Sequence, residues 1–179
     1  MSTASDKNLQ ALKALFGDEA LASRLATTRL AVVTPGQNLP VSGKHLGEVL
    51  VDLLARLWPN IDLHGDAAQE LHAVAVTAAA SGGGSGAAIK VQWAPPYDIV
   101  VAVGCEPPVG AATTIRLGAD DWVAELGPEA QCGESSNPVG PAMAAAMGGA
   151  QVFHHVFERD LDGMGAVPID SWHADVRDL

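Results

Sequence analysis

The sequence predicts an α/β fold: a Rossmann-like three-layer domain whose sheet is mostly parallel, with an antiparallel hairpin at one edge. Short apolar runs alternate with segments of helical periodicity, the order typical of strands joined by crossover helices. In the run 98–103, residues 99–103 are continuously apolar, as in a central parallel strand that is covered on both faces. Two strand-like runs flank residues 118–121, a pattern typical of a β-hairpin.

Apolar spacing and breaker residues define the individual elements. The predicted helices cover residues 9–25, 42–58, 66–80 and 138–158. The predicted strands cover residues 30–33, 61–64, 88–93, 98–103, 114–117 and 122–126. Pro59 ends the second helix, and the Ser/Gly-rich run 81–86 is a connector too short to separate two domains.

The chain has 179 residues, of which 48% are hydrophobic and 17% charged, which suits one domain with a substantial core. We expect residues 1–160 to form this domain. Residues 161–179 form either a C-terminal tail or the start of an element that the sequence does not contain, with Trp172 as their strongest packing anchor.

The formal net charge of −11 does not suit a protein that binds nucleic acid, which needs a basic surface. No apolar run is long enough to span a membrane, and the N-terminus lacks the pattern of a signal peptide, so we expect no membrane association and a cytoplasmic protein. Cys105 and Cys132 are too few for a disulfide framework and are expected to be reduced, buried thiols. A role for Cys105 as a nucleophile is the weaker alternative, because no basic residue lies within a few positions of it.

The loop at residues 34–45 is the candidate anion site, because it lies between a buried strand and a helix N-terminus. A dinucleotide-binding loop needs three glycines, and only Gly36 and Gly43 are present. Against the P-loop pattern, Gly43 and Lys44 match, whereas Asn38 replaces the first glycine and His45 the metal-binding hydroxyl. The location of the loop therefore suits phosphate binding, whereas its residues match the phosphate-binding motifs only in part.

Residues 137–153 resemble the small-residue helix of the ThiF/MoeB/HesA adenylating domains, relatives of the ubiquitin-activating enzymes. The predicted N-terminal helix, the strand 30–33 and the run 97–101 are similar to that family's elements, in the same order, so the resemblance covers about residues 1–160. It implies a Rossmann domain that activates the C-terminal carboxylate of a ubiquitin-like protein with ATP and Mg²⁺. It also implies a dimer, formed with a second copy or with another ThiF-like chain.

The resemblance assigns nucleotide-binding roles to seven residues, which are Gly36, Gln37, Asn38, Gly43, Lys44, Asp62 and Asp66. The first four lie in the segment that would hold the phosphates, and Asp62 or Asp66 would hold the ribose. Cys105 stands about where the family has its magnesium-binding Asp, which leaves Glu106 as the nearby acidic residue for the metal. The family's basic residues after the second strand are missing, because no Lys or Arg lies between Arg56 and Lys90.

We therefore expect a degenerate ThiF-like domain without catalytic residues: a non-catalytic or partner-completing half of an adenylating system, with a ubiquitin-like protein or a second ThiF-like chain as partner. Two alternatives remain. One is an active ATP-dependent adenylating enzyme that takes an arginine from Arg116 or from a partner chain. The other is a Rossmann domain that binds a different nucleotide cofactor.

Overall fold

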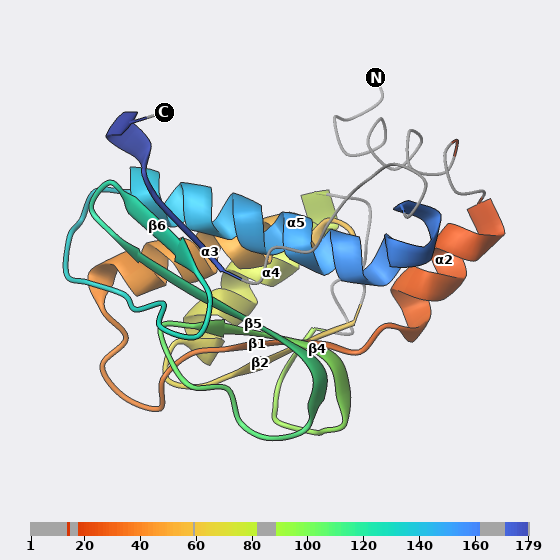
Figure 1. Ribbon diagram of the computed structural model, residues 1–179. Helices are drawn as coiled ribbons and strands as arrows, with labels where there is room; N and C mark the ends of the chain where they lie inside the picture. Colours follow the sequence, from red (N-terminus) through yellow and green to blue (C-terminus); the bar gives the residue numbers. More distant parts are fainter. Residues whose placement is uncertain (1–13, 15–17, 59, 82–88, 162–170, 179) are drawn as a thin grey trace.

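A computed structural model describes Ala14 and residues 18–58, 60–81, 89–161 and 171–178. Its seven strands form one sheet in the order β3-β2-β1-β4-β5-β6-β7 (Figure 1). Strands β3, β2, β1, β4 and β5 are parallel, whereas β6 runs antiparallel to β5, and β7 antiparallel to β6. The structure thus confirms the predicted α/β class, with its mostly parallel sheet and antiparallel edge.

The elements follow the predicted order. The described helices are α2 (Asp18–Thr27), α3 (Val41–Ala55), α4 (Ala68–Ser81), α5 (Val139–Leu161) and the short 3-10 helix η2 (Val176–Asp178). The strands are β1 (Leu30–Val33), β2 (Ile61–His64), β3 (Lys90–Val91), β4 (Tyr97–Val103), β5 (Ala111–Asp120), β6 (Val123–Leu126) and β7 (Trp172–Asp175). None of these helices combines the length and the apolar character needed to cross a membrane.

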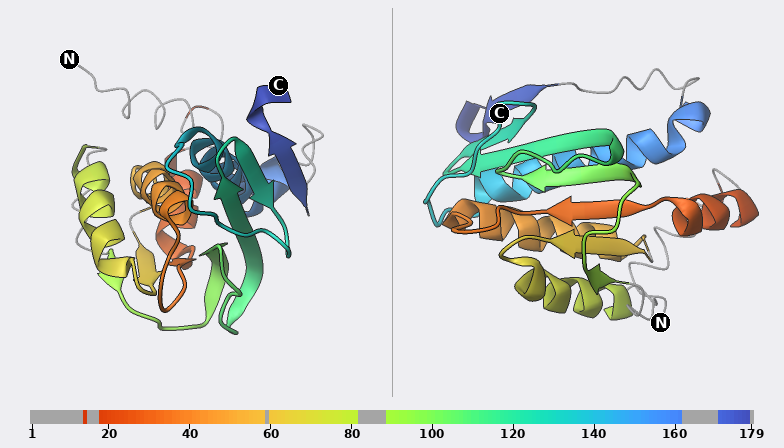
Figure 2. Two further views of the ribbon diagram at one scale, coloured as in Figure 1. Left: turned by 90° about the vertical axis from the view of Figure 1, so that its left-hand side faces the viewer. Right: turned by 90° about the horizontal axis from the view of Figure 1, so that it is seen from below.

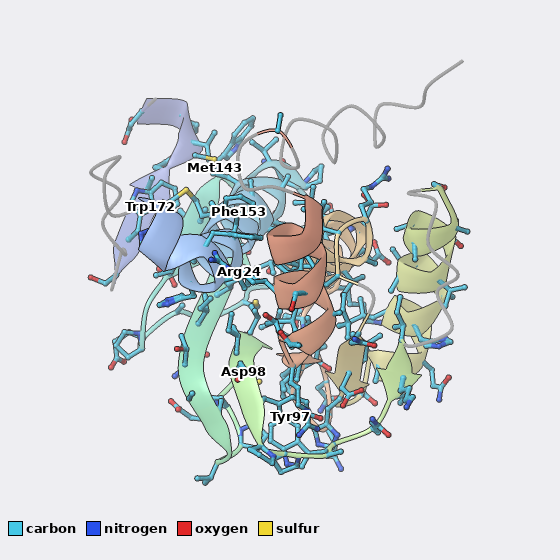
Figure 3. The ribbon with its side chains drawn as sticks, turned by 90° about the vertical axis from the view of Figure 1, so that its right-hand side faces the viewer. Arg24, Tyr97, Asp98, Met143, Phe153 and Trp172 are labelled. Atoms are coloured by element: carbon cyan, nitrogen blue, oxygen red, sulfur yellow. The ribbon has the colours of Figure 1, made fainter. Side chains whose placement is uncertain are left out.

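Helices α4, α3 and α5 lie side by side on one face of the sheet (Figure 2). In β1, Leu30 and Val32 point to this face and join the main hydrophobic core, together with buried side chains of the helices. Met143, Phe153 and Trp172 pack against the same core around α5 and β7 (Figure 3). Burial of these side chains is the main contribution that holds helices and sheet together.

The layer on the opposite face of the sheet is thin. Ala31, Val33, Tyr97 and Val100 form a second, smaller cluster there, against which Trp93 and Cys105 pack. In the described residues this face is covered by the connections 92–96 and 104–110 and not by helices. The predicted third layer is therefore irregular chain, because both connections are too short to contain a crossover helix.

Three local predictions need correction or extension. The hairpin turn is at Asp121 and Trp122, whereas Gly118 lies inside β5. Strand β7 was not predicted, since its polar residues gain strand structure by pairing with β6. Residues 18–25 of the predicted helix 9–25 lie in α2, whereas residues 9–13 and 15–17 lie outside the described residues. Most of the connector 81–86 also lies outside them, and the division into residues 1–160 and 161–179 stays a prediction.

Candidate functional site

The chain changes direction in the sheet between β1 and β4. The connection from β1 leads through α3 to β2 on one side, whereas β4 leads to β5 on the other side. Ligands of parallel α/β sheets bind in the crevice at the carboxyl ends of two such strands. Here that crevice is bounded by the loop 34–40, the first turn of α3 and the chain after Val103.

The loop after β1 lies where the sequence predicts it. Gly36, Gln37 and Asn38 are exposed, and Asn38 has a left-handed backbone with φ of 55°. The loop is tied to the end of β2, because the Thr34 amide donates to the His64 carbonyl (2.8 Å) and the Asp66 amide to the Pro35 carbonyl (2.8 Å). Asp66 therefore lies at the edge of the crevice with the predicted phosphate-binding residues.

The crevice contains a segment of the chain itself, residues 131–134, which we call the crevice segment. Beyond the end of β4, Cys132 forms an isolated parallel bridge with Ala119 of β5, and the Gly133 amide donates to the Ala119 carbonyl (3.0 Å). A Cβ built on Gly43 or on Gly104 would lie 3.2 Å or 2.8 Å from the Cys132 sulfur. The Cys132 side chain thus packs between the start of α3 and the end of β4.

Ser42 fastens the crevice segment to α3. Its hydroxyl is within hydrogen-bond distance of the Ala119 carbonyl (2.5 Å) and the Gly133 carbonyl (2.7 Å), and it accepts from the Gly133 amide (2.9 Å). The Ser42 side chain is fully buried. Buried polar groups that are satisfied in this way resist separation, because each broken bond leaves a donor or an acceptor without water.

The N-terminus of α3 already has its own acceptors. The Ser42 amide donates to the Gly133 carbonyl (3.2 Å), and the Val41 amide points to a carboxylate oxygen of Glu134 (3.5 Å). These are the amides that would hold a phosphate at a helix N-terminus. The oxygens of Gly133 and Glu134 lie in that position, so the arrangement does not fit nucleotide phosphates. Gly43 is buried beneath the crevice segment, and Lys44 is exposed beside it.

Asp62 is separate from this crevice. It is the second residue of β2, pairs in register with Ala31, and accepts from the Gln92 amide group (2.9 Å) and the Tyr97 hydroxyl (2.8 Å). Burial, together with the hydrogen bond to Asp62, raises the pKa of Tyr97 to about 12. This network joins β2 to the start of β4 on the face without helices. Of the two candidate ribose-binding residues, only Asp66 lies beside the predicted phosphate loop.

Glu106, the predicted metal ligand, forms an ion pair with Arg116 of β5. The Glu106 side chain is 82% exposed, whereas that of Arg116 is only 9% exposed. Arg116 also donates from Nε to the Ala130 carbonyl (3.0 Å) and from Nη1 to the Pro128 carbonyl, so it holds the chain that leads into the crevice segment. The described part of the chain contains no group of three or more His, Cys, Asp or Glu residues that could hold a metal ion.

The two thiols are poorly suited to nucleophilic chemistry at neutral pH. Burial raises the pKa of Cys105, and it raises that of Cys132 to about 11. A high pKa keeps a cysteine in its unreactive thiol form.

His154 is buried and His155 half-buried, and their rings meet edge to face with centroids 6.0 Å apart.

The crevice segment is the part of the site that sequence reasoning missed. Residues 127–136 carry no periodic pattern, so the sequence predicts only a loop there. One signal was present: Gly118 within a strand-like run, since glycine in a strand marks a close approach of another backbone. A Cβ on Gly118 would lie 2.3 Å from the Gln131 carbonyl oxygen and 2.4 Å from its nitrogen.

Comparisons with known proteins do not identify the chain. No protein-family model matches it, and no curated protein matches it.

Proposed function

We propose that the chain is a degenerate ThiF-like Rossmann domain that does not adenylate by itself and serves as the non-catalytic or partner-completing half of an adenylating system for ubiquitin-like proteins. The observation that carries the proposal is the occupation of the crevice between β1 and β4 by the chain's own residues 131–134. Under this proposal, the crevice that binds the nucleotide in an adenylating domain is filled in this chain by residues 131–134 and has a structural role only.

The surroundings of the crevice support a non-catalytic role. Adenylation needs positive charge and Mg²⁺ around the leaving pyrophosphate. The Glu134 carboxylate lies at the start of α3, where negative phosphates would need room and positive charge. The guanidinium of Arg116 is held by Glu106 and two backbone carbonyls. Catalysis would require these contacts to be broken before a nucleotide could bind.

Under this proposal the chain acts through a partner. The resemblance suggests a second ThiF-like chain or a second copy of this one, with a ubiquitin-like protein as the substrate of the assembly. The proposal places the protein in the cytoplasm with both thiols reduced. Sedimentation velocity at micromolar concentration tests the homodimer: a single monomeric boundary would leave another ThiF-like chain as the partner.

Exchange of radioactive pyrophosphate into ATP tests the lack of adenylation, because a carboxylate-adenylating enzyme catalyses this exchange reversibly when its carboxylate substrate is present. The purified chain should give no exchange above the buffer blank with short peptides that carry a free C-terminal carboxylate. Exchange that disappears in Lys44→Ala and Asp66→Ala would overturn the proposal in favour of an active adenylating enzyme.

A further inference from the structure

A polar pocket lies at the opposite end of the sheet from the crevice, where the parallel strands begin. Strands β1, β2 and β4 start at Leu30, Ile61 and Tyr97, and the short strand β3 starts at Lys90. In Figure 3, Tyr97 lies at this end of the sheet, below α2. A cavity of about 270 Å³ is bounded here by the end of α2, the starts of β1, β2 and β4, and the chain around β3. The proposed function makes no use of it.

The parallel register brings two cationic side chains to this pocket. Ala31 of β1 pairs with Asp62 of β2, and Asp62 pairs with Lys90 of β3, so the three residues are neighbours across the strands. Arg29 directly precedes β1. Arg29 and Lys90 both line the cavity, and both are exposed. A guanidinium and an ammonium group thus border one small cavity.

Arg29 is oriented by its neighbours and keeps its capacity to bind an anion. Its guanidinium lies over the Tyr97 ring, with Cζ 5.2 Å from the ring centroid, and Nη2 donates to the Ala94 carbonyl. Its backbone amide donates to the Asp98 carboxylate (2.7 Å), but within the described ranges no carboxylate pairs with the guanidinium. The N–H groups on Nε and Nη1 are therefore available to a ligand.

Lys90 also has no ion-pair partner among the residues that the structure describes. It is next to Asp62 in register, yet the two side chains form no ion pair. The Asp62 carboxylate accepts instead from the Gln92 amide group (2.9 Å) and the Tyr97 hydroxyl (2.8 Å). Because a carboxylate has room for further donors, Asp62 can also accept from a hydroxyl group of a ligand.

The lack of carboxylate partners at Arg29 and Lys90 is significant because the chain is acidic. It has 21 Asp and Glu residues for 10 Lys and Arg residues. Arg56, Arg116 and Arg177 each form an ion pair with a carboxylate. Two cations without such a partner in the same pocket create a local positive potential, whereas the net charge of −11 repels anions from the molecule as a whole. Anions are therefore expected to concentrate at this pocket.

We propose that this pocket binds a small metabolite through an oxyanion group, a phosphate or a carboxylate, which is held between Arg29 and Lys90. Arginine binds both groups through parallel N–H donors, and lysine adds a compact charge. Pockets for drug-sized ligands have volumes of roughly 300–1,000 Å³, so a cavity of about 270 Å³ suits a smaller molecule. Asp62 and Gln92 provide hydrogen-bonding groups for hydroxyl substituents.

This inference is independent of the proposed function. The pocket lies at the amino ends of the strands, whereas the crevice that residues 131–134 fill lies at the carboxyl ends. Pyrophosphate exchange tests the crevice and leaves the pocket untested, and the anion titration below tests the pocket without ATP.

Titration of the ¹⁵N-labelled chain with inorganic phosphate at constant ionic strength tests the site. Saturable shifts should appear at the backbone amides of Arg29 and Lys90 and at the side-chain amide of Gln92, with a Kd of about 1 mM or lower. The same titration with acetate distinguishes the two oxyanions, because the metabolite carries the group that binds more tightly. No saturable shift with either anion, or shifts confined to residues 36–44 at the other end of the sheet, would overturn the proposal.

Variants at exposed positions separate this site from a general attraction of anions. Lys90→Gln should weaken phosphate binding about five- to tenfold and Arg29→Gln about tenfold or more, whereas Lys90→Arg keeps the charge and should bind nearly as the wild type does. Arg177→Gln is the matched control. It removes the same charge from an exposed arginine that follows β7 at the other edge of the sheet, so the Kd should change less than about twofold.

Amide spectra of each variant check that it is folded. Normal phosphate binding by folded Lys90→Gln, or equal weakening by Lys90→Gln and Arg177→Gln, would contradict the proposal. Because Lys90 is exposed and its side chain has no partner in the described part of the chain, its replacement tests the site even if Arg29→Gln does not fold.

Discussion

At the scale of single residues, a few buried polar groups fix the geometry of the crevice. Ser42 is the central one, because its hydroxyl contacts both Ala119 and Gly133, residues that are distant from it in the chain. Tyr97 has a comparable role on the other face, where it donates to Asp62 (2.8 Å) and accepts from the Ala94 amide (2.7 Å). Both hydroxyl groups form hydrogen bonds with protein groups, in place of water, where loops meet the sheet.

Ser42→Ala should lower the free energy of unfolding by about 1–3 kcal/mol, because it leaves the buried groups of Gly133 and Ala119 with fewer partners. Ser81→Ala is the matched control: Ser81 is exposed and its hydroxyl donates to the Thr77 carbonyl in its own helix (3.0 Å), so the change should stay within about 0.5 kcal/mol. Urea unfolding followed by circular dichroism measures both. Equal effects of the two substitutions would show that Ser42 does not fasten the crevice segment.

Tyr97 should make the protein less stable at high pH. Burial raises the pKa of Tyr97 to about 12, from about 10 in an unfolded chain. The native state therefore holds the proton more tightly, so this contribution is complete below about pH 10 and is lost as the pH rises toward 12. Because the chain has one tyrosine, phenolate absorbance reports on this residue alone. Asp62→Asn should lower the measured pKa, and a wild-type value near 10 would contradict the network.

At the scale of elements, the sheet strands follow from the sequence more readily than the crevice does. Continuous apolar runs between breaker residues predict β1 and β4, because strands buried on both faces need such residues. Strand β2 alternates apolar with polar residues instead. Strand β7 was missed since its residues Trp172–Asp175 become a strand only against β6. The crevice segment was missed for the same reason: Gly133 contacts Ser42 across 91 positions, a contact that no local pattern encodes.

The path of residues 128–133 depends on position 118 being a glycine, which has no side chain to block the close approach of Gln131. Gly118→Ala would bring a Cβ within 2.3 Å of the Gln131 carbonyl oxygen, so the segment must move, at a cost of about 1–3 kcal/mol. Hydrogen exchange should show faster loss of protection at the Gly133 amide. Gly36→Ala is the control, because nothing lies within 4 Å of a Cβ there and stability should stay nearly constant. Similar exchange rates at the Gly133 amide in both variants would contradict the close packing of the crevice segment against Gly118.

At the scale of the whole molecule, the predicted α/β class is confirmed, whereas the predicted nucleotide site stays a prediction. Gly36, Gln37, Asn38, Gly43, Lys44 and Asp66 do lie around the carboxyl ends of β1 and β2. Asp62 instead contacts Tyr97 and Gln92, and Glu106 contacts Arg116. The fold is thus a Rossmann-like α/β sheet in which the chain's own residues 131–134 fill the crevice between β1 and β4.

Calorimetric titration of Mg-ATP into the purified wild-type chain tests this central claim most directly. We predict no saturable heat up to millimolar ATP, because Gly133 and Glu134 occupy the amides at the start of α3. Saturable binding that is lost in Lys44→Ala and Asp66→Ala would contradict the account and would mean that the crevice segment yields to a nucleotide.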